Sequence, residues 1–320
     1  MTLGSIGFNN TGEKVAVSGY YITMNTQDNV DPYYLYTWMI RPNSILLYKQ
    51  YATGTLLEKQ RVQFPTLSKI PIFIPDKKEQ IQIGSILSTF DQLITLHQRK
   101  CEQLQKVKKG LLQKLFPKDG KDVPEIRFAG FTDAWKQRKL GELADIVRGA
   151  SPRPIQDPKW FDQNSDIGWL RIADVTEQNG RIYHLEQKLS KEGQEKTRVL
   201  TSPHLLLSIA ATVGKPLINY IKTGVHDGFL IFQSPKFDKE FMFYWLDMFS
   251  AQWQKYGQPG SQVNLNSDLV KQQIIFIPTM EEQKQIGTFL NHYDHLITLH
   301  QCELETLNHV KKALLDTMFV

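Results

Sequence analysis

Two short stretches near the middle of the chain combine arginine with turn-forming residues. Arg148-Gly149-Ala150-Ser151-Pro152-Arg153 places two guanidinium groups on one predicted loop, and Trp169-Leu170-Arg171 places a third at a strand end. Guanidinium groups donate paired hydrogen bonds to phosphates and to the acceptor edge of guanine. These stretches supply the first candidate nucleic-acid ligands: Arg148, Ser151, Arg153, Trp169 and Arg171.

Two further turns that contain glycine carry hydroxyl, ammonium and amide donors. The first is Thr212-Val213-Gly214-Lys215 and the second is Gln258-Pro259-Gly260-Ser261-Gln262-Val263-Asn264. They extend the candidate set by Thr212, Lys215, Gln258, Ser261, Gln262 and Asn264. For each of these side chains, a solvated surface loop without a ligand is the alternative interpretation.

The sequence favours no catalytic residue. Asp31-Pro32-Tyr33-Tyr34 lacks the second proline of an amino-methyltransferase signature, so Asp31 and its counterpart Asp238 are predicted to be helix N-caps. Val213-Gly214-Lys215-Pro216 is not a P-loop, because proline replaces the Ser or Thr that would hold Mg²⁺. We expect the chain itself to be catalytically inactive.

Composition indicates a packed, globular protein. The 320 residues are 41% hydrophobic and 11% aromatic, and the net charge of +5 is a mild bias towards acidic partners. Cys101 and Cys302 are too few for a disulfide framework or a four-ligand zinc site. Neither a signal peptide nor a long apolar run is recognisable, which predicts a cytoplasmic protein without membrane partners.

An internal repeat organises the chain. Pro75 and Pro278 lie 278 − 75 = 203 positions apart, and both open segments that share Gln-x-x-Ile-Gly, Leu-Ile-Thr-Leu-His-Gln and Val-Lys-Lys at that same offset. Both segments start with a predicted capping box, Asp76 with Glu79 and Thr279 with Glu282. The repeat predicts two equal helices.

Apolar residues recur in each segment with alternating spacings of four and three. The series runs from Ile83 to Leu115 in the first segment and from Ile286 to Met318 in the second, as in a coiled-coil seam. About 40 residues at 1.5 Å per residue make a helix roughly 60 Å long. Two such helices with equal seams are expected to pack antiparallel, related by a pseudo-twofold axis.

Polar residues occupy the same seam register in both helices, His97 with His300 and Lys108 with Lys311. Such residues fix helix register at some cost in stability. His292, His295 and His300 have helical spacing for metal ligands, but Thr89 and Gln92 replace the first two in the first helix. The repeat therefore predicts no shared metal site.

Mixed α/β segments surround the helices, so the fold class is α+β. Strands are predicted at 167–172, 205–211, 228–232 and 274–277, and an aromatic helix around Trp245. The matching Trp38 helix and the predicted strand at 70–74 make residues 1–75 the second half of a similar lobe. A first half of about 87 residues, equivalent to 117–203, is expected to be missing.

Four segments follow from these patterns. They are a partial lobe at 1–75, a spacer helix at 76–116, a complete lobe at 117–278 and a second spacer helix at 279–320.

Two motifs accompany these four segments: Pro124-Glu125-Ile126-Arg127-Phe128-Ala129-Gly130-Phe131, continuing to Leu140-Gly141, and the Ile277-Pro278 helix entry. Together with these motifs, this organisation resembles the specificity subunit (HsdS) of type I restriction-modification systems. The resemblance covers the whole chain. It implies two target recognition domains, each reading half of a bipartite site in double-stranded DNA, held apart by spacer helices.

The resemblance also implies partners: modification (methyltransferase) subunits and, through the complex, a restriction subunit. Catalysis and the binding of S-adenosylmethionine, ATP and Mg²⁺ would reside on those partners. The alternatives are an inactive or recombination-cassette fragment that acts only as a coiled-coil scaffold, and a methyltransferase or nuclease in its own right.

Overall fold

The computed structural model describes residues 6–19, 21–53, 62–118, 120–210, 212–253 and 265–319. The chain divides into two compact units. Unit 1 comprises Met1–Gln103 with Ile297–Val320, and unit 2 comprises Leu104–Leu296. Because the boundary cuts through both long helices, the units differ from the four segments predicted from the sequence. In the described part of the chain, no helix is long and apolar enough to span a membrane.

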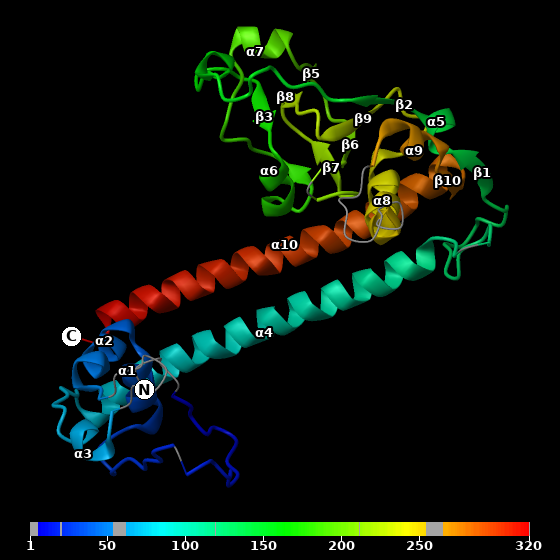
Figure 1. Ribbon diagram of the computed structural model, residues 1–320. Coiled ribbons are helices and arrows are strands. Elements are labelled where there is room, and N and C mark those ends of the chain that lie inside the picture. Colours follow the sequence, from blue (N-terminus) through cyan, green and yellow to red (C-terminus); the bar gives the residue numbers. More distant parts are fainter. Residues whose placement is uncertain are drawn as a thin grey trace. The chain divides into compact units, whose positions relative to one another are not determined.

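Two long helices match the repeated segments. They are α4 (Lys77–Leu115) and α10 (Met280–Thr317), and each is continuous in Figure 1. The predicted seam positions are buried or half-buried, whereas flanking positions such as Leu96 and Leu299 are exposed. The four-three spacing therefore identified the packed face of each helix correctly.

Contacts within each unit show that α4 and α10 run antiparallel. In unit 1, Lys311 donates to Asp91, and further along α4 the Cys101 thiol lies 3.9 Å from the carbonyl oxygen of Ile297. In unit 2, the Lys108 ammonium lies 2.5 Å from Asp294. Residues later in α4 thus contact residues earlier in α10, so the two helices are antiparallel, as predicted.

Unit 1 adds three short helices, α1 (Pro32–Ile40), α2 (Pro42–Tyr51) and α3 (Phe64–Leu67). The carboxylate of Asp31 accepts the backbone N–H of Tyr34 at 2.9 Å, so its prediction as an N-cap is confirmed. Proline cannot continue a hydrogen-bonded helix, and Pro42 accordingly starts a second helix after α1.

The strand predicted at 70–74 is wrong, because the structure shows no strand at 71–76. Its counterpart in unit 2, β10 (Ile274–Ile277), forms a ladder with β1 (Lys136–Lys139). No described residue of unit 1 forms such a ladder with 70–74, and Phe73 is 88% exposed. An apolar alternation becomes a strand only where a partner strand accepts its hydrogen bonds.

The main sheet of unit 2 has five strands in the order β2-β9-β6-β7-β4. Their bounds are β2 Asp145–Arg148, β9 Phe229–Gln233, β6 Leu205–Ser208, β7 Pro216–Asn219 and β4 Arg181–Ile182. The central strands are buried on both faces, which explains why they are continuous apolar runs rather than alternating ones. Helix α8 (Lys239–Trp253) lies beside this sheet and contacts β7 (Figure 1).

A second, three-stranded sheet has the order β3-β8-β5, with β3 Gly168–Leu170, β8 Thr223–Val225 and β5 Arg198–Leu200. Short helices connect the strands: α5 Leu140–Leu143, η2 Pro158–Trp160, α6 Ile172–Glu177, α7 Lys191–Glu195 and α9 Ser267–Gln272. The strands predicted at 167–172, 205–211 and 228–232 are thus present as β3, β6 and β9.

The same contact joins a short helix of each lobe to a long helix. We call α1 in unit 1 and α8 in unit 2 the lobe helices, and they are joined to α4 and α10 respectively. In unit 1, Asp31 N–H donates to Gln80 Oε1 at 2.8 Å, and in unit 2 Asp238 N–H donates to Gln283 Oε1 at 3.0 Å. Asp238 also accepts the N–H of Phe241 at 2.9 Å, so its prediction as an N-cap is confirmed. This correspondence supports the internal repeat predicted from the sequence.

The predicted capping boxes are only half formed. Asp76 accepts the N–H of Glu79 at 2.9 Å, and Thr279 accepts that of Glu282 at 3.4 Å. The fully buried carboxylate of Glu282 instead accepts from both Nε and Nη2 of Arg127, at 2.7 and 2.8 Å. A paired guanidinium satisfies a buried carboxylate better than one backbone N–H does, which explains why Glu282 does not complete its capping box.

Candidate functional site

Asp227 lies at the centre of a polar loop cluster in unit 2. Its carboxylate accepts the hydroxyl of Ser151 at 2.8 Å and the guanidinium of Arg153 at 2.7 Å. Its carbonyl oxygen accepts Nε of Arg148 at 2.5 Å. Burial alone would raise the pKa of Asp227, but the hydrogen bond from Ser151 and the neighbouring cations outweigh burial and lower it. The loop is therefore organised around an ionised carboxylate.

Strand register brings further arginines to the same side of the unit. Strands β3 and β8 are parallel, with Leu170 opposite Val225, so Arg171 and His226 follow at adjacent strand ends. Strand β5 runs antiparallel to β8, and Arg198 lies opposite Val225. Nε of Arg198 donates to the carbonyl oxygen of Arg148 at 2.8 Å.

We call this side of unit 2 the arginine edge, defined by four side chains: Arg148, Arg153, Arg171 and Arg198. Arg148, Arg153 and Arg198 are exposed, and the side chain of Arg171 is 37% exposed. The sequence analysis identified the first three and missed Arg198. Its only signal was an arginine opening a short strand, and nothing in the sequence alone placed that strand opposite β8.

Arg171 is held by two carboxylates. Its guanidinium lies 2.8 Å from Asp174 and 3.3 Å from Glu186. The buried Asp174 carboxylate also accepts the backbone N–H of Arg171 at 2.7 Å, which fixes the start of α6. The pKa of Arg171 is raised, mainly by its hydrogen bond to Asp174.

The turn with Thr212 and Lys215 lies at the same end of the five-stranded sheet. Strand β6 ends with Ser208 opposite Phe229, next to the pairing of Arg148 with Leu230. The Lys215 side chain is 55% exposed and its ammonium is 3.8 Å from Asp247. The Thr212 hydroxyl is 3.3 Å from that of Ser208. Lys215 therefore adds an exposed cation close to the arginine edge.

Trp169 is only 3% exposed, so the structure does not present its ring for contact with a ligand. Its ring packs edge-on against His226, with centroids 5.6 Å apart. Nδ1 of His226 accepts the backbone N–H of Gly228 at 2.8 Å. Burial, with the charges of Arg153 and Arg148, lowers the pKa of His226 despite the opposing charge of Asp227. Trp169 thus packs against the loop that carries His226 and Asp227. Neither of these two residues was predicted from the sequence.

The remaining candidates, Gln258, Ser261, Gln262 and Asn264, lie outside the described residues. The last described residue before them, Trp253, lies close to the turn of Lys215: a Cβ added to Gly214 would approach its ring to 2.4 Å. Gly214 has φ +83°, a conformation that glycine adopts without strain.

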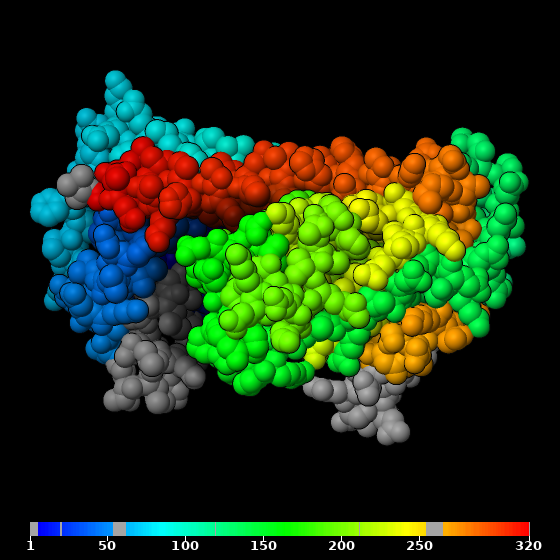
Figure 2. Space-filling view, turned by 90° about the horizontal axis from the view of Figure 1, so that it is seen from above, coloured from blue at the N-terminus to red at the C-terminus, as the bar shows by residue number. Residues whose placement is uncertain are grey.

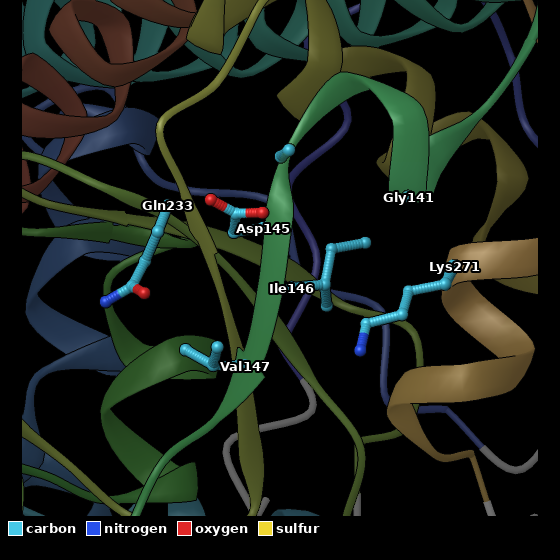
Figure 3. Close-up of a pocket in the computed structure, with 7 residues that line it drawn as sticks. Gly141, Asp145, Ile146, Val147, Gln233 and Lys271 are labelled. Carbon is cyan, nitrogen blue, oxygen red and sulfur yellow. The ribbon is translucent and has the colours of Figure 1, made fainter.

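An open hollow lies beside β2. Figure 3 shows that Asp145, Ile146 and Val147 of β2 line one side and that Lys271 reaches in from α9. Gly141, Ala144 and Gln233 complete the lining. Its groups are a carboxylate, an amide and one ammonium, and they do not form an arrangement typical of catalysis.

The polar seam residues make specific contacts in unit 1 and unit 2. The lysines do not face each other: Lys311 binds Asp91 and Lys108 binds Asp294. Nδ1 atoms of His97 and His300 lie 3.0 Å apart. That these residues fix register stays a prediction.

Comparison with known proteins adds independent information. The family model of the type I restriction modification DNA specificity domain matches residues 2–106 and 132–309. The type I restriction enzyme MjaVIII specificity subunit of Methanocaldococcus jannaschii is 26% identical over 328 residues, covering 96% of this chain and 74% of that protein. The putative MjaX specificity subunit of the same organism is 25% identical over 299 residues, covering 91% and 68%.

Solved structures share the fold. The HsdS subunit of Thermoanaerobacter tengcongensis has a TM-score of 0.54 at 17% identity, over 91% of this chain and 71% of that one. The S subunit from M. genitalium has a TM-score of 0.61 at 15% identity, over 91% and 73%.

The family match covers most of the chain, and the fold of mixed lobes with packed long helices agrees with it. In this family cofactor binding resides on partner subunits. The chain belongs to the family of type I restriction-modification DNA specificity subunits, and it is a non-catalytic subunit that confers DNA specificity.

Proposed function

We propose that the arginine edge of unit 2 reads one half of a bipartite sequence in double-stranded DNA. The observation that carries this proposal is the position of four arginines, on separate loops and strand ends, on one side of the lobe. Arginine forms the commonest specific contact with guanine, through O6 and N7 in the major groove. Lys215 would contact phosphate, which positions the protein without selecting sequence.

The carboxylates of this edge serve to orient the arginines. Asp227 holds Arg153, and Asp174 with Glu186 holds Arg171. A guanidinium fixed by one carboxylate keeps free N–H groups for a second acceptor, because it has five donors. The paired acids also lower the net positive charge, which limits binding to phosphates of any sequence.

We further propose that the chain brings separate modification and restriction subunits to the DNA site, using the long helices and the lobe bases for contact. The lobe in unit 1 would take part in reading the other half-site. A chain that acts only as a coiled-coil scaffold is the alternative, and it predicts no sequence-selective DNA binding.

The experiment is a selection from a random DNA library by the chain assembled with its modification subunit. Arg153→Ala or Arg171→Ala should cost about 1–3 kcal/mol at the selected site and relax selection at one base pair. Lys215→Ala should weaken binding to all DNA sequences alike. It should also lower, by about one, the magnitude of the slope of the logarithm of the binding constant against the logarithm of the salt concentration (the salt slope).

Lys222→Ala is the matched control. Lys222 is half-exposed and paired with Asp166. Lys222 precedes β8 and Asp166 precedes β3, so the pair lies at the end of these strands that is opposite to the arginine edge. It should leave selection unchanged. If both arginine variants lose affinity equally for all sequences, with no relaxed selection at any base pair, the arginine edge does not read bases.

A further inference from the structure

Three metal-ligating side chains converge in unit 1, at the contact between α4 and α10. They are His97 from α4, and His300 with Glu303 from α10. Nδ1 of His97 lies 3.0 Å from Nδ1 of His300, and both nitrogens lie near the same carboxylate oxygen of Glu303, at 2.8 and 3.1 Å. All three side chains are half-buried, at 18%, 23% and 43% exposed.

Hydrogen bonds leave at least one of the three contacts in this triangle unsatisfied. A neutral imidazole nitrogen carries either one proton or one lone pair, and a carboxylate oxygen only accepts. Two Nδ1–H groups can both donate to the same oxygen of Glu303, but the two nitrogens then face each other at 3.0 Å with no hydrogen bond between them. A single proton instead leaves two acceptors facing each other. An electrophile bound by all three atoms would satisfy them together.

We propose that His97, His300 and Glu303 bind one divalent transition-metal ion of the Zn²⁺, Ni²⁺ or Cu²⁺ class. In tetrahedral zinc sites, bonds of about 2.0–2.1 Å place the ligand atoms about 3.3 Å apart. The observed separations of 2.8 to 3.1 Å are a few tenths of an ångström smaller, a difference that side-chain rotation absorbs. Imidazole with carboxylate suits these metals better than Mg²⁺ or Ca²⁺, which prefer oxygen ligands.

The site is open to solvent on one side. Figure 2 shows α10, coloured orange to red, at the molecular surface, and Glu303 is the most exposed of the three ligands. Water can therefore enter to complete the coordination. The proposed ion is structural: it joins α4 to α10 through residues 203 positions apart, and such long closures give the largest entropic stabilisation of the folded chain.

The repeat explains why sequence spacing did not predict this set. His97 and His300 are equivalent positions, but the counterpart of Glu303 is Lys100, an exposed cation. The site is thus single and asymmetric, whereas the sequence-based expectation of no metal considered His292, His295 and His300 on one helix. The proposal is independent of DNA reading by unit 2.

The test is titration of the untagged, chelator-treated full chain with Zn²⁺ by calorimetry, together with Co²⁺ and its visible absorption. One ion should bind per chain with a tetrahedral Co²⁺ spectrum, and Zn²⁺ should raise the melting temperature. His97→Gln or His300→Gln should weaken Zn²⁺ binding by about 100-fold or more, at least as much as an outer-shell substitution.

Glu303→Gln removes the charged ligand while keeping its shape and exposure, so it tests the site even if a histidine variant fails to fold. His309→Gln and Glu305→Gln, exposed on the same helix, should bind Zn²⁺ as the unchanged chain does. The proposal is overturned if the unchanged chain binds no ion. It is equally overturned if binding survives His97→Gln and Glu303→Gln but is lost when His292 and His295 are both replaced by Gln.

Discussion

Asp227 holds the guanidinium of Arg153 at 2.7 Å, although the arginine side chain is 73% exposed. Asp227→Asn keeps the shape of the side chain but removes its charge, so Arg153 becomes free to contact phosphates of any sequence. We expect tighter binding to non-specific DNA, a salt slope steeper by up to about one, and weaker selection of the specific site.

Asp166→Asn provides the control for charge, since it also releases a cation, Lys222, from an exposed pair 2.6 Å long. Binding assays at several salt concentrations distinguish the two variants. Equal effects of both substitutions would contradict an orienting role for Asp227.

The pH dependence of the loop 226–228 follows from His226. Its folded pKa lies below the ordinary value of about 6.5, so the folded chain binds fewer protons there than the unfolded chain. Stability is therefore complete above about pH 6.5 and decreases as pH falls through the folded pKa. Protonation of Nδ1 also breaks its hydrogen bond with Gly228.

Amide exchange of Gly228 should accordingly accelerate, beyond the intrinsic pH effect, as pH falls below about 6.5. His226→Gln should abolish this dependence. An NMR titration that places the pKa of His226 at or above the ordinary value would refute the argument.

Both lobe helices bind their long helix through a tyrosine. Tyr244 donates to Asp294 at 2.5 Å in unit 2, and Tyr33 donates to Asp91 at 2.5 Å in unit 1. Tyr244 is fully buried, and its Asp294 partner is ion-paired with Lys108. Tyr244→Phe should lower the free energy of unfolding by about 1.5–3 kcal/mol, because the lost bond is to a charged group.

Tyr33 is only half-buried, so Tyr33→Phe should cost about 1 kcal/mol. Tyr183→Phe, at a position 63% exposed, should change stability by less than about 0.5 kcal/mol. Urea unfolding measures all three. A Tyr244→Phe loss no larger than that of Tyr183→Phe would show that the contact contributes nothing.

Residues 6–70 should exchange their amide hydrogens much faster than the lobe at 120–278. The described part of unit 1 contains no sheet ladder, and its residues 6–70 expose apolar side chains such as Val15, Tyr21 and Phe64. Few buried contacts permit local opening at low free energy. Hydrogen exchange followed by mass spectrometry checks this, with residues 77–103 of α4 as the internal reference. Equal protection of 6–70 and 120–278 would instead make the first lobe a stable domain.

The sequence predicted well those features that depend on local spacing. The four-three pattern located both helices and their buried faces, and continuous apolar runs located β6 and β9. It failed where structure depends on a partner distant in the chain: 70–74 lacks a ladder, and Glu282 binds Arg127 rather than its own helix N-terminus.

The candidate site shows the same division. Arginines on turn sequences could be identified individually, but Arg198 and Asp227 belong to the edge only through the register of β5, β8 and β3. The burial of Trp169 was not predictable, because an aromatic residue beside an arginine has the same sequence pattern whether it is buried or exposed.

The two tyrosines that bind Asp91 and Asp294 differ in their place on the lobe helix. Counted from the N-caps Asp31 and Asp238, Tyr33 corresponds to Glu240, whereas Tyr244 corresponds to Thr37, one helical turn later. The aspartate and its lysine partner keep their repeat positions, while the hydroxyl donor has changed position. In both copies the acceptor on the long helix is thus at the same position, whereas the hydroxyl that reaches it comes from a different turn of the lobe helix.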